Sequence, residues 1–173
     1  YYTNKNLEGK PALVRKEAEI NHEWKEDAPA PELPADGFSV KWESSFKSEA
    51  DGIIKLMVRG DDGYRVFVND KEVASDWTNH AVTEKEACVQ VEKGHEYKIR
   101  MEYYDNIRDA TAQLIIQTAN TEKLRHALSK FDNVALCVGF TSNTEGENFD
   151  RPFELNTWQK SLIDLISKIK KNT

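Results

Sequence analysis

Strict two-residue alternation of apolar and polar side chains over residues 38–117 constrains the fold more than any other feature of the sequence. A period of two is the signature of β-strands with one face in a core, and turn signals interrupt it about every ten residues, for example "EADG" (49–52), "GDDG" (60–63) and "EKGHE" (92–96). The alternating sets are Phe38, Val40 and Trp42; Ile54, Leu56 and Val58; Tyr64, Val66 and Val68; Tyr97, Ile99, Met101 and Tyr103; Ala112, Leu114 and Ile116. Short strands at this spacing predict an antiparallel β-sandwich.

The period changes after about residue 118. The run 121–131 has helical spacing, with Thr121 expected at its N-cap, and "NVALCVGF" (133–140) is typical of a buried strand. A charged loop follows, and 158–171 has a second helical apolar face. We therefore expect a mainly β chain: a sandwich over 1–118 and a helix–strand–loop–helix fragment of an α/β domain over 119–173. One strand with two helices cannot complete its own sheet, so further domains are expected as partners.

Composition narrows the function classes. The 173 residues carry a net charge of −6, which argues against nucleic acid or an anionic membrane as the main partner. No run of 18 apolar residues is present, so no membrane span is expected. Cys88 and Cys137 lie in apolar runs without metal or redox spacing, and we expect two buried thiols that do not reveal the compartment.

Several segments together resemble a known β-sandwich. They are "YYTNKNLEGKPALVRKEAEINHEW" (1–24), "FSVKWESSF" (38–46), "VRGDDGYRVFVNDKEVASDW" (58–77) and "YKIRMEYYDNIRDATAQLII" (97–116). Read in order, they resemble the protective-antigen-type (PA14) domain over about residues 1–118. The resemblance implies glycan binding, as in adhesins, or an insertion in a carbohydrate-active enzyme.

The second half resembles a different family. "VALCVGFTSNTEGENFDRPFELNTWQKSLIDLI" (134–166) is similar to the segment of glycoside hydrolase family 3 that carries the acid/base loop. That family also carries a protective-antigen-type insertion directly before this strand, so the order of the two parts matches. Asn148 stands where the family pattern has glycine, and Asn156-Thr157 replaces a proline step, where either residue can cap the helix.

The resemblance assigns roles to the charged loop. A retaining glycosidase needs two carboxyl groups about 5–5.5 Å apart, one as nucleophile and one as acid/base. Glu147 matches the acid/base position, Glu145 could raise its pKa or replace it, and Asp150 and Arg151 are expected to support the loop.

The nucleophile belongs to a separate barrel domain in the family. The "SDW" at 75–77 imitates that motif but fits a hairpin of the sandwich, so Asp76 is not expected to be the nucleophile. The chain alone is therefore predicted to be inactive.

Two further features remain open. Asp61 and Asp62 of "GDDG" are either a polar turn or part of a calcium site, with Asp105, Asn106 and Asp109 as additional donors. Arg65 could pair with either aspartate. Trp77 could stack on a sugar, although core packing or loop support is the simpler interpretation for the tryptophans. No other cofactor is expected.

These interpretations leave two main function classes. In the first, the chain is part of an exo-acting β-glucosidase-type enzyme that trims terminal sugars from oligosaccharides or β-glycosides, and the sandwich shapes the substrate pocket. In the second, it is a non-catalytic, lectin-like carbohydrate-binding module. The compartment is left open, with the periplasm or secretion favoured over the cytoplasm, and a spacer role for the sandwich is a third alternative.

Overall fold

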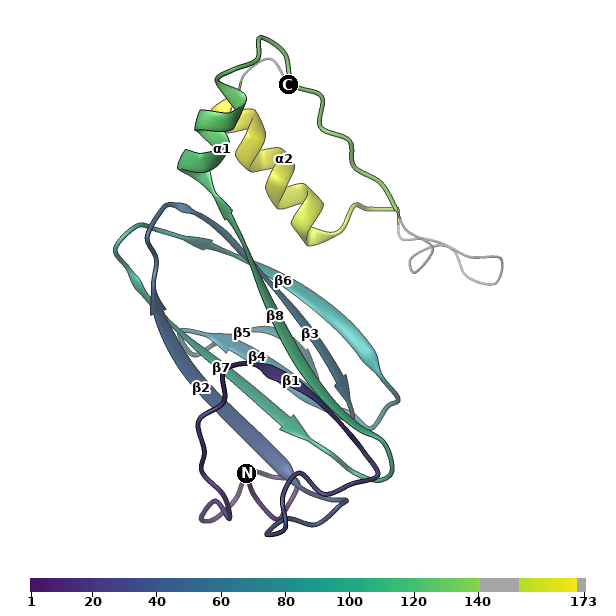
Figure 1. Ribbon diagram of the computed structural model, residues 1–173. Helices are drawn as coiled ribbons and strands as arrows, with labels where there is room; N and C mark the ends of the chain where they lie inside the picture. Colours follow the sequence, from purple (N-terminus) through teal and green to yellow (C-terminus); the bar gives the residue numbers. More distant parts are fainter. Residues whose placement is uncertain (141–152, 171–173) are drawn as a thin grey trace.

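The chain folds into two four-stranded antiparallel sheets that pack face to face, with two helices at one end (Figure 1). The computed structural model describes residues 1–140 and 153–170. The first sheet has the order β1 (Ile20–Lys25), β8 (Ala110–Asn120), β3 (Gly52–Asp61) and β6 (Thr83–Val91). The second has the order β2 (Ser39–Lys47), β7 (Glu96–Tyr104), β4 (Tyr64–Val68) and β5 (Lys71–Asp76). The predicted mainly β sandwich is confirmed.

The core consists of the alternating side chains that the sequence singles out. Ile54, Leu56, Tyr64 and Met101 are fully buried and come from strands of both sheets, and Phe38, directly before β2, is fully buried as well. Each Å² of apolar surface that these side chains bury stabilises the fold by roughly 25 cal/mol, and this burial is the main favourable contribution to folding. The polar residues between them face outward, as period two requires.

Three strands lie outside the five alternating sets: β1 and β6 escaped prediction, and β5 was expected only as part of a hairpin near residues 75–77. β1 alternates half-buried and exposed positions, and in β6 only Ala87 and Val91 are buried. Both lie at the edges of the first sheet, where a strand has a neighbour on one side only and solvent reaches its outward face. Their apolar signal is therefore weak.

The helices lie where the change of period predicts them, with one shift in a cap. α1 (Thr121–Leu128) is capped by Asn120 and not by Thr121, because the Asn120 side chain accepts the hydrogen bond from the amide of Lys123 at 2.9 Å. α2 (Thr157–Ile169) is capped by Asn156 in the same way. No helix in the described ranges combines the length and apolar character that a membrane crossing needs.

The buried strand expected at 133–140 is not observed. These residues lie outside both sheets, and Cys137 and Val138 are exposed. A strand forms only where a neighbour completes its hydrogen-bond ladder, and the eight strands of the sandwich do not accept this segment. The prediction of two buried thiols is wrong for the same reason at Cys137, and Cys88 in β6 is partly buried.

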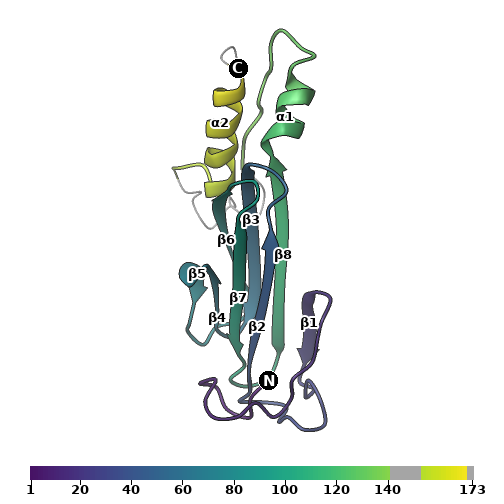
Figure 2. The ribbon, with the colours of Figure 1, turned by 90° about the vertical axis from the view of Figure 1, so that its left-hand side faces the viewer.

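α1 continues directly from β8, and α2 adds side-chain contacts with the first sheet. Lys55 of β3 pairs with Glu86 of β6 at 2.7 Å, and both side chains are largely buried. The backbone amide of Trp158 donates to Glu86 at 3.5 Å, and the ammonium group of Lys55 lies 5.8 Å from the centre of the Trp158 ring. α2 therefore contacts the first sheet through this ion pair and this aromatic ring, and Figure 2 shows both helices beyond the same end of the sandwich.

Candidate functional site

Three inter-strand loops gather at the end of the sandwich that lies away from the helices (Figure 1). They follow β3, β5 and β7, and they bring together Asp61, Asp62 and Asp105. We call these three residues the acidic end. It contains both aspartates of the "GDDG" motif, so it is the described part of the chain in which predicted site residues converge.

Asp62 ties two of these loops together. Its side chain is almost buried, and its two carboxylate oxygens accept hydrogen bonds from the backbone amides of His80 (3.1 Å) and Asn106 (2.7 Å). Amide donors satisfy a buried carboxylate and offset the cost of its desolvation. The geometry thus makes Asp62 a clamp between the loop after β5 and the loop after β7.

Asp105 is the most unusual group at the acidic end. Its side chain is fully buried; one carboxylate oxygen accepts from the amide of Gly37 at 3.1 Å, and the other has no hydrogen-bond partner. Burial, reinforced by the negative charges of Asp62, Asp36 and Asp61, raises the pKa of Asp105 to about 7. Protonation near neutral pH removes a buried charge that the surroundings do not compensate.

Asp61 has a milder environment. Burial, followed by the charges of Asp62 and Asp109, raises the pKa of its carboxyl group. The hydroxyl of the buried Tyr103 donates to the backbone oxygen of Asp61, which holds the end of β3 against β7. The acidic end therefore concentrates negative charge and stabilises its most buried carboxyl in the protonated form.

Calcium at Asp61 and Asp62 stays a prediction. Calcium takes about six to eight oxygen ligands. In residues 1–140 and 153–170, no three His, Cys, Asp or Glu side chains are grouped as a metal ion would need. The described side chains do not by themselves fit a calcium ion, and Asp62 already serves two amides.

Arg65 does not pair with the aspartates of the motif, contrary to one expectation. Its guanidinium bonds Glu102 at 2.5 Å and lies 4.2 Å from the centre of the Trp77 ring. Trp77 also packs edge-on against Tyr104 at 4.8 Å. One face of the indole is thus covered by Arg65, which favours support of the loop over sugar stacking by Trp77.

The "SDW" motif at 75–77 lies in a hairpin of the sandwich, as the sequence predicts. Asp76 ends β5, which forms a hairpin with β4. A hydrogen bond from the Thr78 hydroxyl at 2.8 Å, helped by His80 and Lys85, lowers the pKa of Asp76. The residue belongs to the sandwich and not to a barrel strand.

The charged loop falls beyond what the structure describes. Glu145, Glu147, Asp150 and Arg151 all lie in 141–152, outside the described residues. Their predicted roles stay predictions.

Sequence reasoning missed a second polar cluster, centred on Glu17. Its largely buried carboxylate accepts hydrogen bonds from the Tyr1 hydroxyl (2.7 Å), the Arg15 guanidinium (2.7 Å) and the Trp42 indole. Burial alone would raise the pKa of Glu17, but these donors outweigh it and lower the pKa to about 2. Arg15 and Glu17 are two residues apart, which places them on one side of an extended chain; no other signal marks the cluster.

Comparison with known families decides the identity of the sandwich. The family model described as the PA14 domain matches residues 1–128. The chain belongs to the PA14 domain family. The family match extends over all eight strands and α1, and the division predicted at residues 118 and 119 falls near the end of β8.

Two kinds of known protein are similar to this chain, one in sequence and fold and the other in fold alone. The anti-sigma-I factor RsgI3 of Acetivibrio thermocellus is 28% identical over 71% of the chain, and a solved anti-sigma factor domain-containing protein is 27% identical over 69% with a TM-score of 0.62. The chain spans only 19% and 43% of these two proteins. A β-glucosidase from Kluyveromyces marxianus, solved with glucose, is 18% identical, has a TM-score of 0.54 and aligns over 99% of this chain and 23% of its own.

Proposed function

We propose that this PA14 chain is part of a retaining, exo-acting β-glycosidase of the β-glucosidase type. The observation that carries the proposal is the extent of the structural likeness. The K. marxianus β-glucosidase aligns over 99% of the chain, whereas the anti-sigma proteins align over 69% and 68%. At 18% identity the likeness concerns the fold alone, but it includes the helical end beyond the sandwich.

The sequence of that helical end supports the same assignment. The charged loop and the capped α2 that follows it resemble the acid/base segment of glycoside hydrolase family 3. In this proposal Glu147 protonates the leaving oxygen and then removes a proton from the attacking water. The nucleophile comes from the remaining domains of the parent enzyme, because Asp76 is committed to its hairpin.

The sandwich has a positional role in the proposal. Its buried core and the loops that Asp62 ties together form one body, and α2, which follows the proposed catalytic segment, contacts this body at Glu86. Such a body, placed beside the pocket, restricts the aglycone side of an oligosaccharide or β-glycoside substrate. The chain alone does not hydrolyse glycosides.

The experiment compares Glu147→Ala with Glu145→Ala in the intact parent protein. The two glutamates are two residues apart in one loop, so each variant controls for the other. Loss of the acid should reduce hydrolysis of an unactivated disaccharide by orders of magnitude and hydrolysis of an activated aryl β-glucoside much less, because its leaving group needs less protonation. Equal loss on both substrates, or a larger loss in Glu145→Ala, would overturn the assignment of Glu147.

A second candidate function has its own support. The anti-sigma relatives have the higher sequence identities, 27% and 28%, which favours a non-catalytic carbohydrate-binding module in a regulatory protein. Saturable binding of an oligosaccharide by the intact parent protein, with no hydrolysis of that sugar or of aryl glycosides, would favour this second function.

A further inference from the structure

The first turn of α2 makes a hydrogen bond that leaves the helix. Gln159 is the third residue of α2, and its amide donates to the side chain of the N-cap Asn156 at 2.9 Å. A glutamine at this position ordinarily turns back to the N-cap of its own helix. Here its side-chain nitrogen Nε2 donates to the backbone oxygen of Gly139 at 2.6 Å, 20 residues away in sequence. Because a carbonyl oxygen can only accept, the contact requires the nitrogen end of the Gln159 amide to face Gly139.

This bond joins the two sides of the chain that flank residues 141–152. Gly139 lies shortly before those residues, and α2 begins at Thr157, shortly after them. Between α1 and Gly139 the chain runs back toward the start of α2 (Figure 1). Residues 131–140 belong to neither sheet, and Gly139 is exposed. Gln159 therefore fixes a point of the chain that no strand ladder holds.

The start of α2 is itself held by the first sheet. The amide of Trp158, in the same first turn, donates to the Glu86 carboxylate of β6 at 3.5 Å. Glu86 is in turn paired with Lys55 of β3 at 2.7 Å, and the side chains of this pair are only 22% and 11% exposed. A carboxylate near the N-terminus of a helix is favoured by the helix dipole. The largely buried pair therefore gives the first turn of α2, with Gln159, a defined place on the sandwich.

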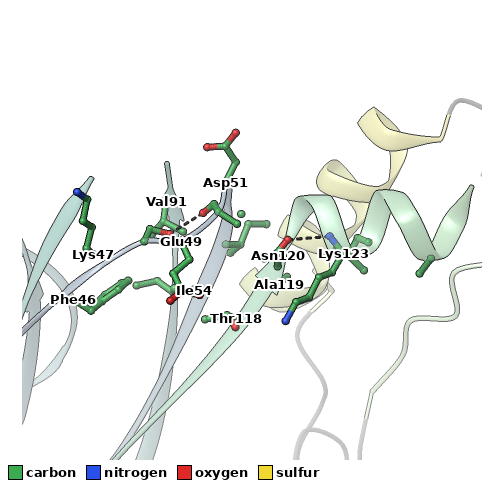
Figure 3. Close-up of a pocket in the computed structure, with 16 residues that line it drawn as sticks. Phe46, Lys47, Glu49, Asp51, Ile54, Val91, Thr118, Ala119, Asn120 and Lys123 are labelled. Carbon is green, nitrogen blue, oxygen red and sulfur yellow. Dashed lines mark hydrogen bonds between the residues drawn. The ribbon is translucent and has the colours of Figure 1, made fainter. Parts of the chain in front are cut away.

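The other end of α2 is held by α1. The ammonium group of Lys170, at the C-cap of α2, donates at 3.4 Å to the backbone oxygen of Leu128, the last residue of α1. α1 continues from β8, and the bond between the Asn120 side chain and the Lys123 amide fixes its start (Figure 3). α2 is therefore anchored at both ends, and its first turn can hold another segment in place.

We infer that Gln159 is a positioning residue for the proposed acid/base segment. Its bond to Gly139 ties the chain before residues 141–152 to the helix that follows them. The inference rests on the proposed function, in which Glu147 of this segment protonates the leaving oxygen. Proton transfer needs the acid within hydrogen-bond reach of that oxygen, and a displacement of about 1 Å can lower the rate roughly a hundredfold. Gln159 acts through the backbone that carries Glu147 and not on the substrate.

The test compares two substrates in the intact parent protein carrying Gln159→Glu. Glutamate has the shape of glutamine and is equally suited to this position of a helix start, so α2 should stay folded, but its carboxylate cannot donate to Gly139. We expect kcat/KM for an unactivated disaccharide to fall about tenfold or more, and kcat/KM for an activated aryl β-glucoside to fall less than about twofold, because its leaving group needs little protonation. Partial unfolding would lower both values by the same factor.

Two further variants complete the test. Gln159→Met removes the donor without adding a charge and should show the same selective loss. Gln117→Glu makes the same chemical change as Gln159→Glu at an exposed residue of β8 and should alter neither value. If the wild type hydrolyses both substrates and Glu147→Ala loses the disaccharide selectively, then equal loss on both substrates, no loss, or a loss confined to Gln159→Glu would overturn this inference alone. A wild-type parent protein that hydrolyses neither substrate, or a Glu147→Ala variant without that selectivity, would overturn the proposed function and this inference with it.

Discussion

Asp105 should make the stability of the sandwich fall as pH rises, and a substitution that cannot ionise should abolish that fall. An aspartate has an ordinary pKa of about 3.9. The pKa of about 7 in the fold therefore means that ionising Asp105 costs about 4 kcal/mol of folding free energy. The group is fully buried, and one of its oxygens lacks a partner, so solvent does not screen this cost.

The sign follows from proton linkage. The folded state holds the proton more tightly than the unfolded chain, so the contribution of Asp105 is fully present below about pH 4 and is lost as pH rises through 7. Asp105→Asn keeps an oxygen for the amide of Gly37 and cannot ionise. We expect this variant to match the wild type within about 1 kcal/mol at pH 4 and to exceed it by up to about 4 kcal/mol at pH 8.

Urea unfolding at pH 4, 6 and 8 measures this difference directly. The control is Asp109→Asn, an exposed carboxylate in the same loop, for which the change should stay within about 0.5 kcal/mol at each pH. A stability difference between Asp105→Asn and the wild type that does not depend on pH, or a variant that is less stable at pH 8, would refute the reasoning.

Three other predictions concern separate parts of the molecule. Hydrogen-bond donors such as Trp42 lower the pKa of Glu17, so its ionised carboxylate stabilises the fold above about pH 4, and this stabilisation is lost as pH falls toward 2. Glu17→Gln should remove it, and the melting temperature of the variant should therefore fall less steeply between pH 4 and 2 than that of the wild type. Trp158→Ala should lower the free energy of local opening of α2 by about 2 kcal/mol while leaving the sandwich intact, since the ring packs over Lys55. Relative to the wild type, hydrogen exchange should accelerate in α2 and not in the strands, and equal acceleration in both would contradict this. Calcium at the acidic end predicts a saturable calorimetric signal that Asp62→Asn abolishes, and no signal at millimolar calcium would retire the metal site.

Alternation predicted the sandwich well because its central strands carry one uniformly apolar face. Ile54, Leu56 and Val58 keep strict period two in the middle of a sheet, and each is fully buried. The edge strands β1 and β6 were missed because one of their faces remains wet, which dilutes the pattern. The segment 133–140 was misassigned because an apolar run specifies a strand only together with neighbours that complete its ladder.

The candidate site was predictable in type but not in detail. The "GDDG" motif marked a loop of functional interest, and the structure places both aspartates at the acidic end with Asp105. The two amides that occupy Asp62 come from residues 18 and 44 positions away in sequence, so no local pattern could reveal them. The same holds for the Glu17 cluster, where Trp42 reaches across 25 residues.

The most direct measurement of the central claim is azide rescue of Glu147→Ala in the intact parent protein, with an activated aryl β-glucoside as substrate. Without the acid/base, the glycosyl-enzyme formed from this substrate should persist, and azide can attack it without base assistance. The proposal predicts faster turnover with azide and a glucosyl azide that retains the β configuration. Turnover that azide does not change, or an azide product with the inverted configuration, would contradict the assignment of Glu147 as the acid/base of a retaining glycosidase.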